Sequence, residues 1–203
     1  MILLFSVLST GYAEPQEYAF LSNKGLLYVH VHKAETLAAD LSHDHAIQAV
    51  GWSGKASLDL ADYASCQISI SVPVNNLQVD NPDVRKIAGI EGSISDGMRA
   101  DVKKHMLSDV QLDAEKYPMI TFKSTGCEGS GESMTLNGNF TLHGVTKAVS
   151  IPTAVSTANG LTLKGTLPVK ATDYGITPYS AMFGAVGNKD GMEIHFNLEA
   201  ANN

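Results

Sequence analysis

Four histidines near the amino end of the chain form two pairs with i, i+2 spacing. His30 and His32 are one pair, and His43 and His45 are the other. Residues two apart in a strand point to the same face. If the two segments form a hairpin, all four imidazoles can approach one another and bind Zn²⁺ or Cu²⁺, whereas alternation turns Asp44 away. The alternative is that these polar pairs only decorate a solvated edge of a sheet.

The sequence contains none of the common short motifs of enzymes. A Gly-x-Ser-x-Gly elbow, a Walker loop, a His-Glu-x-x-His motif and a Cys-x-x-Cys motif are all absent. Acidic residues are scattered among turns and outward positions, without an obvious facing pair for acid–base work. Together with the resemblance to a family of binding barrels that residues 116–124 and 137–149 carry, this absence predicts a protein that is not an enzyme and requires no cofactor. A hydrolase remains the minority reading, and no nucleophile can be nominated for it.

Most of the chain alternates apolar and polar residues in short stretches separated by Gly, Asn, Asp and Ser. This pattern predicts strands with one buried face. Short turn sequences at 128–131 and 157–160 favour an antiparallel meander, because parallel strands need long crossovers. We predict an all-β fold of eight antiparallel strands that close into a barrel, at 24–32, 45–60, 66–78, 118–127, 132–143, 145–155, 160–171 and 191–201.

The long interval from about 80 to 117 is predicted as a short helical insertion between strands three and four. In its first piece, Asn81 can cap a helix and Gly89 can end it. In its second piece, which has Ser95 or Asp96 as its cap, apolar residues recur at four-residue spacing, at Met98, Val102 and Met106. Such helices are placed to cover one mouth of a barrel.

Two cysteines, Cys66 and Cys127, are predicted to form a disulfide. In a meander, the start of the third strand lies opposite the end of the fourth. Cys66 shares the inward parity of its strand, but Cys127 is out of phase with the inward Phe122. A bulge near Gly126 would bring both sulfurs to one face.

The amino end bears on the location of the protein, and the overall charge bears on its partners. Residues 1–13 are mostly apolar and end in Gly11-Tyr12-Ala13, which predicts a signal peptide truncated at its start; the alternative is an apolar tail on a cytoplasmic protein. Residues 14–203 then form one domain. No later segment approaches the length of a membrane span. The net charge of −7 disfavours nucleic acid as a partner.

Several blocks of sequence resemble the YceI-like family. The run N-G-N-F-T-L-H-G-V-T-K-A-V at 137–149 is similar to the family signature G-x-L-T-L-H-G-V-T-K-x-V, with Asn139-Phe140 in place of the usual pair. The run K-Y-P-M-I-T-F-K-S at 116–124, W-S-G at 52–54 and D-Y-G-I at 173–176 are similar to further family motifs and follow the family's order. Two departures are a longer segment before Ser108 and K-A-T at 170–172, which replaces a basic-Ser pair.

The resemblance implies a lipocalin-like barrel, periplasmic or secreted, whose lumen holds a polyisoprenoid, a quinone-like molecule or another fatty lipid. The expected partner is thus a hydrophobic small molecule. The alternative function is that of an exported metal- or haem-binding protein that uses the four histidines. Whether the protein forms a homodimer is left open. Three aromatic residues between the last two strands are candidates for the mouth. They are Tyr174, Tyr179 and Phe183.

Alternation assigns eleven apolar side chains to the inner wall of the barrel. Either they surround a ligand or they fill the interior as ordinary core residues, because eight-stranded barrels do both. They are Trp52, Leu58, Ile70, Val72, Phe122, Phe140, Leu142, Leu163, Leu167, Ile194 and Phe196.

Overall fold

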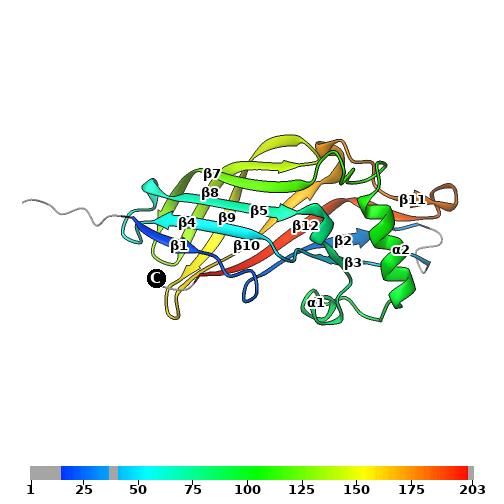
Figure 1. Ribbon diagram of the computed structural model, residues 1–203, viewed down its shortest axis with the longest axis horizontal. Coiled ribbons are helices and arrows are strands. Elements are labelled where there is room, and N and C mark those ends of the chain that lie inside the picture. The colour runs from blue at the N-terminus through cyan, green and yellow to red at the C-terminus, as the bar shows by residue number, and fades with distance from the viewer. Residues whose placement is uncertain (1–14, 37–40, 201–203) are drawn as a thin grey trace, which may run out of the picture.

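The computed structural model describes residues 15–36 and 41–200, and this part of the chain is mostly strand (Figure 1). The expected signal peptide lies outside the described residues. None of the helices in the described ranges is long and apolar enough to cross a membrane. The elements are β1 (Gln16–Ala19), β2 (Leu26–Lys33), β3 (His45–Gln48), β4 (Ser53–Leu58), β5 (Gln67–Pro73), β6 (Gln78–Val79), α1 (Pro82–Ile87), α2 (Asp96–Leu107), β7 (Met119–Ser130), β8 (Ser133–Leu142), β9 (Val145–Ser156), β10 (Leu161–Lys170), β11 (Ser180–Ala181) and β12 (Val186–Ala200).

The strands form one antiparallel sheet that curls into a barrel. Its order is β1-β4-β5-β7-β8-β9-β10-β12-β2-β3-β6, and β11 pairs with β12. The sheet closes on itself because Phe20, just after β1, bridges Ala200 at the end of β12, beyond Asn197, where the pairing of β12 with β2 ends. The backbone N–H of Phe20 donates to Gly54 and that of Leu21 to Glu199, at 2.9 and 2.7 Å. The segment after β1 therefore joins β4 to the last residues of β12.

The predicted all-β antiparallel class is confirmed, although the number of strands differs. The predicted strand 45–60 is two strands, because the chain turns at Gly51 (φ 63°) after pairing with β2 and before pairing with β5. The predicted strand 66–78 is likewise divided into β5 and β6 by a short 3-10 helix at Val74–Asn76. The prediction missed β1 and β11, which are too short to show a clear alternation.

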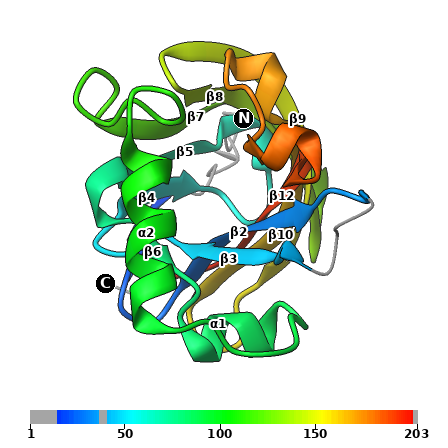
Figure 2. The same ribbon diagram turned by 90° about the vertical axis from the view of Figure 1, so that its right-hand side faces the viewer.

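The helical insertion lies where the sequence predicts it. The Asn81 side chain accepts a hydrogen bond from the Asp83 N–H and caps α1, and Ser95 caps α2 by accepting from the Met98 N–H. Figure 2 looks along the barrel and shows α2 lying across its end, with α1 beside β3. Helix α2 therefore lies over one mouth of the barrel, as expected, whereas α1 packs beside the wall at β3 and does not cover the mouth.

A disulfide joins β7 to the segment that leads into β5. Cys66 and Cys127 are bonded, with their Cα atoms 5.8 Å apart. The pairing of β7 with β8 shifts in register between Ser124 and Gly126, which is the bulge that the sequence required. The shift turns Cys127 inward, and both cysteines are buried in the core.

Gly138 on β8 leaves room for an aromatic ring inside the barrel. A Cβ at this position would collide with the ring of Phe122 and would lie 2.7 Å from the carbonyl oxygen of Lys123. The ring can move, but the backbone oxygen is fixed by the sheet. Gly126 contrasts with this position, because a Cβ there would meet no atom within 4 Å.

A buried ion pair fastens α1 to β3. Asp80 is 0% exposed; its carboxylate accepts from Arg85 Nη1 at 2.8 Å, from the Ala46 N–H at 2.9 Å and meets His45 Nδ1 at 2.7 Å. Arg85 also donates to the carbonyls of Asp44 and Glu91, both at 2.8 Å. Burial alone raises the pKa of Asp80, but the hydrogen bonds from His45, Ala46 and Arg85 hold it below its ordinary value of 3.8.

We expect Gly138→Ala to lower the free energy of unfolding by about 1–3 kcal/mol, because the added methyl overpacks the wall. Urea unfolding followed by circular dichroism measures the change. Gly126→Ala is the matched control and should leave the midpoint near that of the wild type. Equal stability of the two variants would contradict the packing described here.

Asp80→Asn should cost about 3–5 kcal/mol at neutral pH, because it leaves the buried guanidinium of Arg85 without a counter-charge. Asn tolerates the positive φ of 52° at this position, so the change isolates the charge. Because the folded pKa of Asp80 is lowered, its contribution is complete above pH 3.8 and is lost as the pH falls below that value.

The difference between wild type and Asp80→Asn should therefore narrow in urea titrations below pH 3.8. Glu35→Gln removes an exposed partner of Lys189 and should leave the free energy of unfolding unchanged, because water screens that pair. A wild-type-like Asp80→Asn protein at neutral pH would refute the role assigned to the ion pair.

Candidate ligand-binding site

The barrel encloses a cavity of about 540 Å³. Its wall is built by inward residues of eight strands, and α2 with the segment 176–179 closes over one end. This volume lies within the usual range for small-molecule sites. The apolar wall residues are Leu27, Val29, Val31, Ile47, Ala49, Ile68, Ile70, Val72, Leu77, Val102, Met106, Leu112, Ile120, Phe122, Leu136, Phe140, Leu142, Ile151, Leu167, Ala171, Ile176, Pro178, Met192, Ile194, Phe196 and Leu198.

Several of these side chains are only partly buried although they point into the barrel. Val29, Ile70 and Ile194 are examples: each packs against the core on one side and lines the cavity on the other. Their accessible surface faces the cavity rather than protein atoms. The interior is therefore not filled by its own side chains at this level, and a ligand would gain apolar contact there.

Eight of the eleven predicted wall residues line this cavity, and three do not. Trp52, Leu58 and Leu163 are buried in the solid core. Leu58 pairs with Gln16 and Leu163 with Leu198 at the floor of the cavity. Alternation predicts the face of a side chain but not how far a cavity extends along the strand. The eight that line the cavity are Ile70, Val72, Phe122, Phe140, Leu142, Leu167, Ile194 and Phe196.

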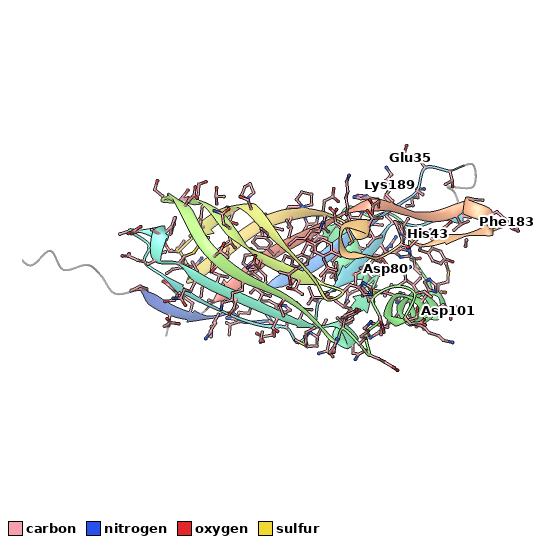
Figure 3. All side chains as sticks on the ribbon, turned by 90° about the horizontal axis from the view of Figure 1, so that it is seen from above. Glu35, His43, Asp80, Asp101, Phe183 and Lys189 are labelled. Atoms are coloured by element: carbon pink, nitrogen blue, oxygen red, sulfur yellow. A yellow bond between two sulfur atoms is a disulfide. The ribbon has the colours of Figure 1, made fainter. Side chains whose placement is uncertain are left out.

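The three predicted mouth residues have different surroundings. Tyr179 lines the cavity, and its ring meets the edge of the His105 ring with centroids 4.8 Å apart. Tyr174 is buried and packs edge to face on Phe140, with centroids 5.6 Å apart. Phe183 is fully exposed in the turn after β11 and does not line the cavity (Figure 3). Of the three predicted mouth residues, only Tyr179 therefore lines the cavity.

Polar side chains gather where α2 meets the barrel, and the sequence analysis missed most of them. Figure 3 shows Asp101 and Lys189 at the same end of the molecule as Asp80. The four-residue spacing of Val102 and Met106 indicates the covered face of α2, and Asp101 and His105 flank that face. We call the polar residues that line this end of the cavity the polar rim: His45, Asp101, His105, Gln111, Tyr179, Asn188 and Lys189.

The structure does not bring the four histidines together. His45 pairs with Val31 across the β2–β3 ladder, so it shares the inward face of Val31 and lines the cavity. His30 and His32 lie on the outer face of β2, and His43 is exposed before β3 begins. Because Asp44 also precedes the strand, alternation does not apply to it. Its carboxylate meets His30 at 3.3 Å, contrary to the prediction.

A family model for the YceI-like domain matches residues 30–200. A UPF0312 protein of Pseudomonas aeruginosa is 39% identical over 72 residues, which are 35% of this chain and 38% of that protein. Protein YceI of Salmonella arizonae is 36% identical over 72 residues, with the same coverage of 35% and 38%. The chain thus matches well under half the length of these curated relatives.

Two solved structures have the same fold. BcnA of Burkholderia cenocepacia superposes with a TM-score of 0.65 at 17% identity, over 88% of this chain and 98% of that one. A polyisoprenoid binding domain from Saccharophagus degradans gives a TM-score of 0.59 at 14% identity, over 92% of this chain and 98% of that one. At these identities the likeness concerns the fold. Because the family model covers most of the sequence, the chain belongs to the YceI-like domain family.

Proposed function

We propose that this protein holds a long apolar amphiphile inside its barrel, a polyisoprenoid, a quinone-like molecule or a fatty lipid, and performs no chemistry on it. The observation that carries the proposal is the cavity of about 540 Å³ with an almost wholly apolar wall. The polyisoprenoid binding domain of Saccharophagus degradans, which shares the fold, adds support. In both cases the support is for an apolar ligand rather than for one named compound.

The free energy of such binding would come mainly from removing hydrocarbon from water. Each buried methylene contributes about 0.8 kcal/mol, so a chain of several methylenes or isoprene units can be held without any polar contact. The polar rim lies at one end of the cavity, where it can hydrogen-bond the head of an amphiphile. His105, Tyr179 and Lys189 there offer donors to an oxygen-bearing head group.

The composition of the cavity wall supports holding rather than hydrolysis. Among the described residues that line the cavity there is no serine or cysteine. Of the two histidines that line the cavity, His45 directs Nδ1 to the buried carboxylate of Asp80 at 2.7 Å. Because acyl transfer needs a nucleophile beside such a histidine, we assign His45 to positioning a head group.

We further propose that the protein works in the periplasm or is secreted. The expected signal peptide motivates this location, and the Cys66–Cys127 disulfide supports it because disulfides persist mainly in oxidising compartments. The homodimer stays a prediction, which sedimentation equilibrium can check.

Filling the cavity should weaken ligand uptake without unfolding the barrel. Ile70→Trp places a large ring in empty space on the inner wall, so it should displace at least two methylenes of a bound chain. That loss is about 1.6 kcal/mol, or roughly a tenfold lower affinity. Geranylgeraniol and palmitic acid are suitable probes, and native mass spectrometry measures the fraction bound.

Ser69→Trp is the matched control, because Ser69 is the outer-face neighbour on the same strand and pairs with Lys55 and Lys123. It should bind both probes as the wild type does. The proposal fails if the wild type takes up neither probe, or if Ile70→Trp binds them as tightly as Ser69→Trp.

A further inference from the structure

Four side chains of types that commonly bind metal ions lie together on the outer wall of the barrel, at three adjacent strands. His30 and His32 project outward from β2, and Glu193 pairs directly with His30 across the β12–β2 ladder. Asp44 comes immediately before β3, on the other side of β2. All four side chains are half-buried. The cluster is therefore carried mainly by the paired strands β2 and β12 and is separated from the cavity by the sheet itself.

The donor atoms of this cluster are already close together. One ligand atom each from His30, His32 and Glu193 lie within 4.8 Å of one another. The two imidazole centroids are 4.1 Å apart. Asp44 Oδ2 is 3.3 Å from His30 Nε2 and 3.8 Å from His32 Nδ1. A tetrahedral Zn²⁺ with bonds of about 2.0–2.1 Å separates its ligand atoms by about 3.4 Å, which small side-chain rotations would reach.

Each carboxylate of the cluster is also held in place. The backbone N–H of Lys33 donates to Asp44 Oδ1 at 2.9 Å, and Glu193 Oε2 is 2.5 Å from His32 Nε2. Asp44 therefore turns its second carboxylate oxygen toward the imidazoles of His30 and His32, at 3.3 and 3.8 Å.

We propose that His30, His32, Glu193 and Asp44 form a binding site for a divalent transition-metal ion of the zinc type on the outer wall of the barrel. Two imidazole nitrogens and two carboxylate oxygens suit a borderline ion, whereas Ca²⁺ and Mg²⁺ prefer six or more oxygen ligands. The site is independent of the proposed ligand in the cavity. It takes the place of the four-histidine site predicted from the sequence, because His45 lines the cavity and His43 is exposed before β3.

The test is a titration of the full chain, produced without a polyhistidine tag, with Zn²⁺ in a calorimeter. The wild type should bind one Zn²⁺ per chain in a saturable manner, and an excess of Ca²⁺ should not displace it. His32→Ala and, separately, Glu193→Gln should each weaken Zn²⁺ binding by at least about tenfold, because each removes one ligand. The second variant covers the case in which the first does not fold.

His43→Ala is the matched control, since it removes a histidine one residue from Asp44 that is not in the cluster, and it should bind Zn²⁺ as the wild type does. Uptake of geranylgeraniol by each variant reports on the barrel and on the cavity, so a failure of the metal site is distinguishable from a failure of the proposed function. The absence of saturable one-to-one binding would overturn the proposal. The proposal would also be overturned if His32→Ala and Glu193→Gln both bind Zn²⁺ with an affinity within twofold of the wild type.

Discussion

The structure depends on the burial of one face of a single sheet against itself. Strands that alternate apolar and polar residues must hide their apolar face, and a sheet of this length can do so by curling until its edges meet. Here the bridge from Phe20 to Ala200 joins the segment after β1 to the last residues of β12, and the turn at Gly51 lets residues 45–58 pair with β2 on one side and with β5 on the other. Without this closure, the inner wall would be exposed to water rather than enclosing a cavity.

Local signals in the sequence predicted much of the fold because each reflects a short-range constraint. The caps at Asn81 and Ser95 and the bulge near Gly126 are present where the residue types require them. The run that contains His143 and Gly144 forms the turn between β8 and β9. His143 has a φ of 51° and its Nδ1 lies 3.1 Å from the Tyr174 carbonyl oxygen, so this histidine shapes a turn in the structure.

The site was less predictable because it depends on register and depth. A one-residue difference in pairing decides whether a histidine faces the cavity or the solvent. His45 lies opposite Val31 and faces inward, whereas His30 lies opposite Ala46 and faces outward. Leu163 has the same alternation as Leu167, yet only Leu167 lines the cavity. The position of α2 at the mouth was predicted, but Asn188 and Lys189, which also line the cavity, come from a distant segment, and no local pattern encodes that proximity.

The two faces of β2 carry residues of the two proposed sites. Leu27, Val29 and Val31 line the apolar cavity, while His30 and His32 face the two carboxylates outside. The central claim is that the inner face holds a hydrophobic guest. The most direct measurement is native mass spectrometry of the protein as purified from an exporting host, before and after extraction with organic solvent. The account predicts a mass excess that extraction removes and that is a long-chain apolar molecule; an unloaded chain that also takes up no isoprenoid or fatty probe would contradict it.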